Sequence, residues 1–372
     1  MARTQTRPTV AVCAQHVRSG RRTGVERYAL SVARSFLARP GSDLDIRIIA
    51  APSVAQELPS GDTRVVKLAT ELRLWNDQVT LPRLLQRLNI GLAHYTAYGP
   101  PICGRTPYVL TVHDAVFWDH EGSLSRLGRS YYRPLLTWAL RDDPRLKWVV
   151  CDSAMTQAAL RRHFPRLVGR SSVVRLAPVI VPREGQREWT IEQRLEAPAI
   201  LAVGTIEPRK NVGAVVRAFE RVREAVPAAT LHVVGRLAWA RRDERNLLSA
   251  PGVVHYERLP DDGLADLYSR AALLISLSRL EGFNLPVAEA RAFGLPVIVS
   301  DLPVHHEVTG DVGCIFVDPD NVSDAGRQAV RVLTDHDLWR RLAREARLEH
   351  RGDSWDRVRD ELRVVYARVS EQ

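Results

Sequence analysis

Short apolar runs alternate with stretches of helical periodicity through both halves of the chain. Nearly every position in each run is apolar and many are β-branched, which is typical of parallel strands covered by helices on both faces. The alternation of run, helix and run is the pattern of βαβ crossover units. The predicted strands are residues 10–14, 46–50, 65–68, 92–95, 108–112, 148–151 and 173–176, and then 200–203, 230–234, 253–256, 273–277, 297–300 and 314–317.

This pattern predicts an α/β fold of two doubly wound, Rossmann-like domains that face each other across a cleft. Between the two sets of strands, residues 178–196 contain prolines, a glycine and several charges, which marks a linker. We therefore place an N-terminal domain at residues 1–185 and a C-terminal domain at residues 186–354. Helical spacing of Val358, Leu362, Val365 and Ala367 predicts a terminal helix in residues 355–372, a candidate to cross back to the first domain.

Charge is distributed unequally between the two halves. Of the net charge of +10, residues 1–185 contribute 27 Lys and Arg against 14 Asp and Glu, whereas residues 186–372 hold 26 against 29. A basic first half suggests a polyanionic partner, an anionic membrane surface or nucleic acid; a general abundance of Arg is the alternative explanation. Because this half lacks interleaved aromatic residues and a recognisable reading motif, we expect no nucleic-acid partner.

The sequence predicts no membrane span, because no apolar run approaches the roughly 18 to 20 residues that a transmembrane helix needs. We expect a cytoplasmic protein, with peripheral attachment to the inner face of the cell membrane as a hypothesis. The cysteines are scattered without a C-x-x-C pair, so we interpret them as reduced core thiols rather than metal ligands or disulfides. They are Cys13, Cys103, Cys151 and Cys314.

Residues 123–138 form the candidate segment for membrane attachment. Its apolar residues fall near helical spacing and its arginines supply cations, as in helices that lie on anionic membranes. The alternative is a helix that faces the core with a solvated basic side, and Pro134 either breaks or starts it. The apolar residues are Leu124, Leu127, Tyr131, Leu135 and Trp138, and the cations are Arg126, Arg129 and Arg133.

The first candidate site follows the first predicted strand. Thr23 and Glu26 have the spacing of a capping box, and an apolar helix face continues from there. A helix therefore begins at a glycine-bearing loop, where free N–H groups and the positive end of the helix dipole favour a phosphate. Gly24 would let such a ligand approach the backbone. An ordinary turn between strand and helix is the alternative.

The second candidate is His113, directly after the apolar run 108–112. Open parallel sheets bind ligands beyond the carboxyl ends of their strands, which places His113 where it can face a cleft. A purely structural histidine is the alternative.

The third candidate is the segment 204–211, which follows the first strand of the second half and leads into a helix. Arg209 and Lys210 could hold a diphosphate there, Lys as a mobile point charge and Arg as a planar fork. A solvated pair of cations is the alternative. Lys is found only at Lys67, Lys147 and Lys210, which favours a function for the last of them.

The fourth and most specific candidate is the segment 278–290, which runs from a buried strand into a helix. Pro286 suits the first turn of that helix and Gly294 suits its end. Glu281 then lies in the loop and Glu289 in the first turns of the helix. Two such carboxylates accept hydrogen bonds from sugar hydroxyls while the backbone amides between them meet a phosphate. Two unrelated surface glutamates are the alternative.

These motifs together resemble the retaining glycosyltransferases of the GT-B fold, specifically glycosyltransferase family 4 (glycosyl transferases group 1), and within it bacterial mannosyl- and rhamnosyltransferases. The resemblance rests on residues 204–211, on the E-x7-E pattern of Glu281 and Glu289, and on residues 292–300. It extends to Glu307, Gly310, Phe316 and Asp318-Pro319, and in the first half to the Gly24 loop, His113-Asp114 and Ser153.

The resemblance implies that the second domain binds a nucleotide-diphosphate sugar and the first a glycan or lipid-linked acceptor. By this analogy Glu281 contacts the donor sugar, Glu289 the ribose, and Arg209 and Lys210 the diphosphate, while Gly24 and His113 close the cleft from the other side. The implied catalytic residues are His113, Glu281, Arg209 and Lys210. The implied donor-binding residues are Gly24, Gly204, Thr205, Arg209, Lys210, Gly282, Phe283, Asn284, Leu285 and Glu289.

Two positions depart from the family pattern. Asn284 stands where the family usually has Gly, which puts close backbone approach in doubt. Thr205 stands where some members have Arg, so Arg209 takes on more importance as a cation.

Retention of configuration in this family is thought to need no covalent intermediate, because the leaving phosphate assists attack on its own face. We therefore assign no nucleophile, and we expect neither a cofactor nor a metal. The D-x-D segments at 43–45, 318–320 and 335–337 are interpreted as accidental. Segment 204–211 resembles that of bacterial mannosyl- and rhamnosyltransferases, and this resemblance implies GDP-mannose as donor. The alternatives are a sugar-nucleotide epimerase or phosphorylase of similar fold and, from another class, a basic nucleic-acid-binding protein.

Overall fold

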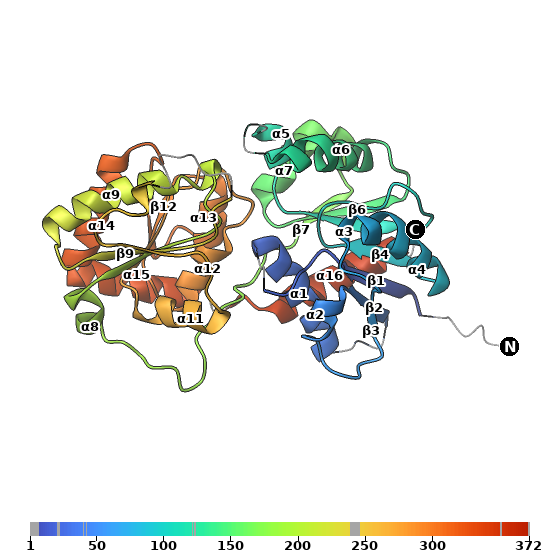
Figure 1. The fold of residues 1–372 in the computed structure, drawn as a ribbon, viewed down its shortest axis with the longest axis horizontal. Coiled ribbons are helices and arrows are strands. Elements are labelled where there is room, and N and C mark those ends of the chain that lie inside the picture. Colours follow the sequence, from blue (N-terminus) through green and yellow to red (C-terminus); the bar gives the residue numbers. More distant parts are fainter. Residues whose placement is uncertain are drawn as a thin grey trace. The chain divides into compact units, whose positions relative to one another are not determined.

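The computed structural model describes residues 7–20, 23–39, 41, 43–120, 122, 124–238, 246–349 and 352–370. The chain divides into two compact units, Met1–Leu176 with Ser354–Gln372 (unit 1) and Ala177–Asp353 (unit 2). Each unit is an all-parallel sheet with helices packed on it (Figure 1). The division falls before the linker that the prolines suggested, and the last helix is grouped with the first unit.

Unit 1 has a sheet in the order β3-β2-β1-β4-β5-β6-β7. Its strands are β1 (Thr9–Ala14), β2 (Asp45–Ala50), β3 (Val65–Lys67), β4 (Leu92–Tyr95), β5 (Tyr108–Val112), β6 (Leu146–Cys151) and β7 (Ser171–Val173). Its α-helices are α1 (Gly24–Ala38), α2 (Pro52–Ala55), α3 (Arg73–Trp75), α4 (Leu81–Arg87), α5 (Val116–Asp119), α6 (Arg133–Arg141), α7 (Ala154–His163) and α16 (Trp355–Ser370). Segments η1 (Asn76–Thr80) and η3 (Gly128–Tyr132) are π-helical, and η4 (Pro165–Leu167) is a 3₁₀ turn.

Unit 2 has a sheet in the order β10-β9-β8-β11-β12-β13. Its strands are β8 (Ala199–Val203), β9 (Thr230–Val234), β10 (Val253–Tyr256), β11 (Leu273–Ser276), β12 (Val297–Ser300) and β13 (Cys314–Val317). Its helices are α8 (Ile191–Glu196), the 3₁₀ turn η5 (Pro208–Lys210), α9 (Val212–Ala225), α11 (Asp261–Arg270), α12 (Leu285–Ala292), α13 (Pro303–Thr309), α14 (Val322–Thr334) and α15 (His336–Glu349).

The predicted strands are all found, and the largest disagreement is at β7. The sequence placed this strand at 173–176, whereas the structure places it at Ser171–Val173. Val174 and Leu176 are buried but lie past the strand, in the irregular stretch that leads out of the unit. The apolar pattern reports burial rather than hydrogen bonding, so the predicted strand extends beyond the last residue of β7 that pairs with β6.

Each sheet reverses its strand order at one place. In unit 1 the chain builds outward from β1 to β3 and then from β4 to β7, so β1 and β4 are neighbours with crossovers leading away in opposite directions. In unit 2 the same reversal separates β8 from β11. At such a switch point the loops beyond the carboxyl ends of the two strands diverge and leave a crevice, which is where open α/β sheets bind ligands.

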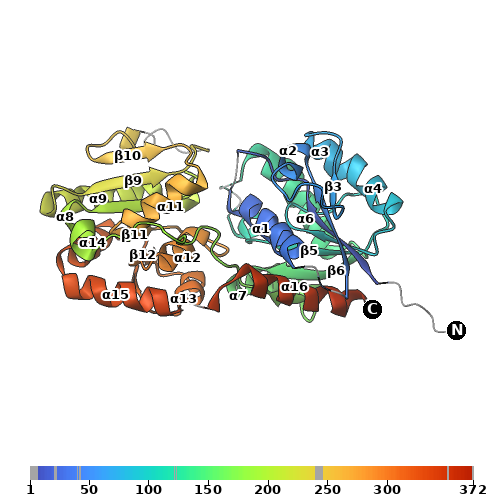
Figure 2. The same cartoon turned by 90° about the horizontal axis from the view of Figure 1, so that it is seen from below.

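Helix α16 completes the core of unit 1 by packing against α1 and β6 (Figure 2). Tyr366 is fully buried, stacks on Phe36 of α1, and contacts the Nδ1 atom of His94 in β4 through its hydroxyl at 2.6 Å. Val369 is buried whereas Ala367 is exposed, so the predicted apolar face is shifted at its carboxyl end.

Most of the segment predicted to meet a membrane folds into unit 1. Ser123 lies outside the described residues. Pro134 occupies the first turn of α6, and Leu135 is 7% exposed, so the apolar side of this helix faces the core. Leu127, before η3, is 47% exposed. Among the described residues no helix is both long and apolar enough to cross a membrane.

The cysteines are not all core residues. Cys13 and Cys151 are fully buried in β1 and β6, where burial raises the pKa of both thiols. Cys314 is half-buried and Cys103 is exposed, so the interpretation as core thiols is wrong for Cys103. The Cys103 position in a proline-rich loop gave no apolar periodicity that could have indicated burial or exposure.

Candidate active site

The loops after β8 and β11 meet at the switch point of unit 2. After β8 the chain passes through Gly204 and Thr205 into η5, and Asn211 in the left-handed region (φ 53°) starts α9. After β11 the chain crosses residues 277–284 and enters α12. The backbone N–H of Arg279 donates to the carbonyl of Arg209 at 2.8 Å, which joins the two loops directly. The third and fourth candidate segments are therefore one structural site.

Glu281 is the centre of this site and is only 3% exposed. Its Oε1 lies 2.5 Å from Nζ of Lys210, and its Oε2 lies 3.2 Å from Nη1 of Arg209. Arg209 also contacts Glu207 Oε1 through Nε at 2.5 Å and donates to the Leu280 carbonyl at 3.1 Å. The structure thus brings together Glu281, predicted to contact the donor sugar, with Arg209 and Lys210, predicted to contact the diphosphate.

The charges of this cluster compensate one another. Burial raises the pKa of Glu281, but Lys210 and Arg209 outweigh it and lower that pKa to about 2. Glu281 is therefore ionised, and together with Glu207 it balances the two cations. Because every partner is held by a fixed neighbour, the cations are positioned before a ligand arrives, which is the arrangement that stabilises developing charge most effectively.

Asn284 adopts the conformation that glycine would supply. Its φ is 78°, in the left-handed region that Asn tolerates better than other side-chain-bearing residues. Its Nδ2 donates to Ser276 Oγ at 3.0 Å and to His305 Nε2 at 2.9 Å, while His305 Nδ1 donates to the Ser300 carbonyl at 2.7 Å. The departure from the family pattern is therefore accommodated with the backbone turn intact. The Oδ1 atom of Asn284 is buried without a hydrogen-bond partner among the described residues.

The segment from Gly282 to Leu285 is buried and leads into the first turn of α12. Phe283 is 5% exposed and Leu285 is 6% exposed. Pro286 occupies the first turn of α12 and Gly294 follows its end with φ 64°, as the sequence predicted. The amide donors of this helix start lie at the switch point beside the loop that carries Glu281.

Glu289 lies in the middle of α12 and is 2% exposed. Its Oε2 accepts from the Tyr268 hydroxyl at 3.0 Å, and its Oε1 accepts from the backbone N–H of Ile180 at 3.4 Å. Both carboxylate oxygens thus already have protein partners. A ribose bound there would have to share or replace these hydrogen bonds.

Gly235, after β9, was not singled out by the sequence but shapes this edge of the sheet. A Cβ added to it would lie 1.9 Å from the carbonyl oxygen of Gly204, so the two loop backbones touch at this point. Any side chain at this position would displace the Gly204 loop and with it the start of η5. A glycine directly after a predicted strand was the signal available in the sequence.

In unit 1, His113 follows β5 and both of its ring nitrogens are engaged. Nδ1 lies 2.6 Å from Asp152 Oδ2, and Nε2 lies 2.9 Å from the Thr96 carbonyl. Burial alone lowers the pKa of His113, but the Asp152 carboxylate reverses this effect and the pKa is raised overall. A cationic imidazolium that donates from both nitrogens fits this geometry. Because both ring nitrogens of His113 are protonated in this arrangement, an electrostatic role fits it better than that of a general base.

The start of α1 carries its own carboxylate. The capping box predicted for Thr23 and Glu26 is present, and the Thr23 backbone N–H donates to Glu26 Oε2 at 2.7 Å. Gly24 is exposed and begins the helix. Residues 21–22 lie outside the described residues. One donor of the predicted phosphate site is thus occupied by a negative charge, which opposes binding of an anion there.

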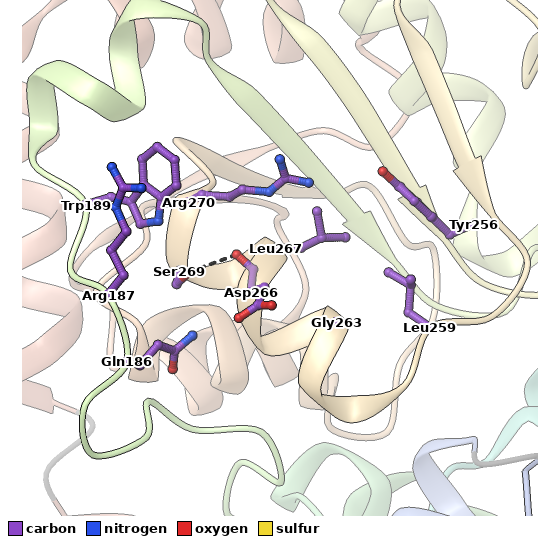
Figure 3. Close-up of a pocket in the computed structure, with 10 residues that line it drawn as sticks. All are labelled: Gln186, Arg187, Trp189, Tyr256, Leu259, Gly263, Asp266, Leu267, Ser269 and Arg270. Carbon is purple, nitrogen blue, oxygen red and sulfur yellow. Dashed lines mark hydrogen bonds between the residues drawn. The ribbon is translucent and has the colours of Figure 1, made fainter.

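Unit 2 also has a cavity of about 450 Å³ that contains none of the predicted site residues. Figure 3 shows it between α11 and the stretch that carries Gln186, Arg187 and Trp189. Arg187 stacks on the Trp189 ring at 4.2 Å, and Tyr256 and Leu259 lie on the other side. The cluster of Glu281, Arg209 and Lys210 is therefore separate from this cavity.

In the parts of the chain that the structure describes, no group of three or more His, Cys, Asp or Glu side chains is arranged to hold a metal ion. Of the D-x-D segments, Asp45 pairs with Arg47, Asp320 pairs with Arg279, and Asp335 caps the start of α15 through the Leu338 N–H.

Comparison with known families resolves the class of the protein. Residues 22–175 match the family described as Glycosyltransferase Family 4, and residues 187–349 match Glycosyl transferases group 1. The chain belongs to glycosyltransferase family 4. The two matches fall on unit 1 and unit 2, so each unit of this family 4 chain corresponds to one recognised domain.

Curated relatives match parts of this family 4 chain. The serotype-specific mannosyltransferase WbdA of Escherichia coli is 34% identical over 32% of the chain and 15% of its own length. The O-antigen chain mannosyltransferase RfbU of Salmonella typhimurium is 31% identical over 57% of each protein. The matched region thus covers 15% of WbdA and 57% of RfbU, less than two thirds of either relative.

Solved structures match the family 4 chain over nearly its full length. Sucrose-phosphate synthase from Thermosynechococcus elongatus has a TM-score of 0.73 at 16% identity, covering 98% of this chain and 99% of the other. HepE from Anabaena, solved with UDP and glucose, has a TM-score of 0.71 at 13% identity, covering 97% and 99%. These similarities concern the fold and confirm the predicted GT-B class of two parallel-sheet α/β domains.

Proposed function

We propose that the protein is a retaining glycosyltransferase that moves mannose from GDP-mannose to a glycan or lipid-linked acceptor during polysaccharide or glycoconjugate assembly. The observation that carries the proposal is the buried trio of Glu281, Arg209 and Lys210 at the switch point of unit 2. A nucleotide diphosphate needs fixed cations, and a sugar ring needs a carboxylate that accepts from its hydroxyls. This trio offers both, because the Glu281 carboxylate lies within hydrogen-bonding distance of the two cations.

The donor identity rests on the two mannosyltransferase relatives, WbdA and RfbU. HepE was solved with UDP and glucose, which makes a uridine donor the competing hypothesis. Thermal stabilisation and turnover are measured with GDP-, UDP- and dTDP-sugars. We expect GDP-mannose to give the largest shift in melting temperature and the fastest release of nucleotide. Stabilisation by UDP-sugars alone would refute the choice of GDP-mannose.

Two features of the reaction belong to the same proposal. We propose metal independence because Arg209 and Lys210 supply the positive charge that a metal would bring to the leaving diphosphate. Activity should survive EDTA, and loss with EDTA that Mg²⁺ restores would contradict this. Retention is read from the anomeric configuration of the product by NMR. Epimerisation or phosphorolysis of the donor without acceptor would favour the alternative enzyme classes instead.

We also propose peripheral attachment to an anionic membrane through unit 1, now by a different surface from the one that the sequence favoured. Leu72 is 67% exposed, Leu74 45% and Trp75 54%, at and beside α3. Arg73 stacks on Tyr132 of η3, which places α3 next to the segment that follows the exposed Leu127. A cytoplasmic location on the inner face of the membrane is part of this proposal.

Sedimentation with liposomes tests the attachment. We expect binding to anionic but not neutral vesicles, weakened by salt. Trp75→Ser should reduce it, whereas Trp189→Ser in unit 2 should not. Equal recovery with both kinds of vesicle, or no effect of Trp75→Ser, would contradict attachment through α3.

A further inference from the structure

The cavity of about 450 Å³ in unit 2 lies outside the proposed donor site. It is bounded by α11, by residues 186–189, and by the end of β10 with the loop that follows it (Figure 3). Neither Glu281 nor the cations that pair with it contribute to the lining. The volume falls in the range of pockets that bind small molecules, roughly 300 to 1,000 Å³. The cavity is therefore large enough for a ligand of its own.

The wall formed by residues 186–189 is held in place by hydrogen bonds to both ends of its neighbour α11. Gln186 donates from Nε2 to the Ala265 carbonyl at 3.1 Å. Arg194, which is only 5% exposed, donates from Nη1 to the Ala271 carbonyl at 2.7 Å and from Nε to the Trp189 carbonyl at 3.4 Å. These hydrogen bonds fix the shape of the wall, so binding would cost little ordering of the protein.

Two aromatic side chains lie on opposite sides of the cavity (Figure 3). Trp189 and Tyr256 are half-buried, so each keeps part of its ring accessible. The Tyr256 ring is stacked on His232 of β9 at an interplanar angle of 11°, and its hydroxyl lies 3.1 Å from His232 Nδ1. Leu259 adds apolar surface on the same side. Because the Tyr256 hydroxyl already has a partner, its ring offers mainly apolar surface to a ligand.

Three charged side chains line the cavity without ion-pair partners. Arg187, Asp266 and Arg270 are exposed, and none of them forms an ion pair with the described residues. Asp266 and Arg270 are four positions apart on α11, a spacing at which opposite charges on a helix can pair. Since they do not pair, a carboxylate and a guanidinium both remain available to a ligand. Arg187, stacked on Trp189 at 4.2 Å, places a second guanidinium at the opposite wall.

Gly263 keeps the α11 side of the cavity open. It lies three positions before Asp266, on the helix face that also carries Arg270. Glycine is among the least favourable residues inside a helix. A Cβ added here would lie 3.6 Å from Leu259 Cδ2, which is an ordinary contact, so packing does not require glycine. A need for the space beside Gly263 accounts for a residue that neither the helix nor its packing favours.

The combination of aromatic surface and opposite charges selects the class of ligand. An anion would meet the Asp266 carboxylate, and a cation would meet the two arginines. An apolar ligand would leave the charged groups at the cavity without partners. The ring of a neutral sugar has apolar C–H faces that pack on aromatic rings, and hydroxyls that donate to a carboxylate and accept from a guanidinium. A neutral sugar therefore matches both kinds of surface.

We propose that this cavity is a glycan-binding site of unit 2, separate from the donor site. A neutral sugar of the glycan packs on Trp189 and Tyr256 and forms hydrogen bonds with Asp266 and Arg270. The binding itself follows from the lining of the cavity and does not depend on the proposed reaction. One addition rests on the proposed glycosyltransferase function: the glycan held here is a part of the acceptor or product chain that does not react. Such a site keeps a growing polysaccharide attached between transfers.

Saturation-transfer NMR on the full chain tests the site with methyl α-mannoside, mannobiose and maltotriose as probes. Wild type should bind at least one of them. Asp266→Ala should weaken that binding by about 10-fold or more, because a hydrogen bond to a charged group is lost. Gly263→Leu fills the space and should abolish binding, while its melting temperature should equal or exceed that of wild type because leucine favours a helix more than glycine does. Glu220→Ala, at an exposed position of α9, is the matched control for Asp266→Ala and should bind as wild type does.

Each outcome decides one question. If no probe binds, or if Asp266→Ala or Gly263→Leu binds as tightly as wild type, the glycan site is wrong. If inorganic phosphate binds at the cavity and the glycans do not, the ligand class is wrong. If GDP or UDP displaces the glycan, the site is not separate from the donor site. Thermal shifts with nucleotide sugars report on the donor site and should be the same in Gly263→Leu as in wild type. Absence of those shifts in wild type, with Asp266-dependent glycan binding intact, would refute the glycosyltransferase proposal and leave the glycan site standing.

Discussion

The two switch points of this protein have the same topology and opposite electrostatic design. In unit 2, the polar side chains at the end of β8 and β11 are ionised and paired with one another, with Glu281 between Arg209 and Lys210. In unit 1, the side chains directly after β1 are neutral, and His16 lacks any hydrogen-bond partner in the described residues.

The difference determines what each switch point can hold. A diphosphate carries charge into the site, so its cations must be fixed beforehand by carboxylates or they would repel each other and move. The polar side chains directly after β1 carry no charge, so they need no charged partner to hold them in place. The same fold edge therefore supports either design, and the side chains after the strand decide between them.

The largest expected effect is the loss of Lys210. As the bond to the donor sugar breaks, negative charge grows on the diphosphate, and a fixed cation stabilises that charge more than it stabilises the bound donor. Lys210→Ala should lower kcat by roughly 100-fold or more, with a smaller rise in the KM for the donor. Steady-state kinetics with the preferred donor measures both values.

Lys67→Ala in β3, which removes an exposed lysine, is the control and should leave kcat unchanged. Arg209 contacts the same carboxylate, so the double variant should be worse than either single one without strict additivity. Wild-type kcat in Lys210→Ala would overturn the role assigned to this cation.

The next effect concerns stability and tests whether the trio is a true ion cluster. The folded pKa of Glu281 is about 2, below the ordinary glutamate value of 4.5. A depressed pKa contributes stability that is present above pH 4.5 and is lost as the pH falls from there toward 2. This contribution is on the order of 3 kcal/mol.

Urea unfolding of wild type and Glu281→Gln between about pH 7 and pH 2.5 measures this effect. Gln mimics a protonated Glu281, so the gap in unfolding free energy should be widest at neutral pH and should narrow as the pH falls. Glu196→Gln, at an exposed residue of α8, is the control. A gap that stays constant with pH would show that Glu281 is not held ionised by its neighbours.

The sequence predicted the strands of both sheets well because parallel strands are apolar on both faces. It also predicted the places of the loops 204–211 and 278–290, since a polar motif at the end of an apolar run can only lie at the carboxyl edge of the sheet. What it could not predict is that Lys210 and Glu281, 71 positions apart, contact each other. Which loops lie next to each other depends on the order of the strands in the sheet, and the hydrophobic periodicity of the sequence does not reveal that order.

The unpaired polar atoms directly after β1 were missed for a related reason. Gln15 and His16 prolong the run of β1, and His16 shares with His113 the position just beyond an apolar strand. The pairing of His113 with Asp152 and the lack of a partner for His16 among the described residues are tertiary facts that the sequence does not distinguish. The π-helical segments η1 and η3 are equally invisible, because their apolar spacing is that of an ordinary helix.

The smallest effect sharpens the contrast within unit 1 itself, where two buried histidines lie near the same sheet edge in different charge states. Asp152 raises the pKa of His113, whereas burial and neighbouring cations, His113 among them, lower the pKa of His16. Histidine ring signals followed by NMR from about pH 5 to pH 8.5 should show His113 titrating above the ordinary value of 6.5 and His16 staying neutral throughout.

Asp152→Asn separates the two histidines. Without the carboxylate, burial dominates, and the pKa of His113 should fall below that of the wild type. A raised histidine pKa contributes stability that is fully present below pH 6.5 and is lost as the pH rises through the pKa of the folded state. Asp152→Asn should therefore be less stable than wild type at low pH, and this difference in unfolding free energy should shrink at high pH. Asp119→Asn, beside the more exposed His163, is the control. An unchanged His113 pKa in Asp152→Asn would mean that the charge of this histidine is set elsewhere.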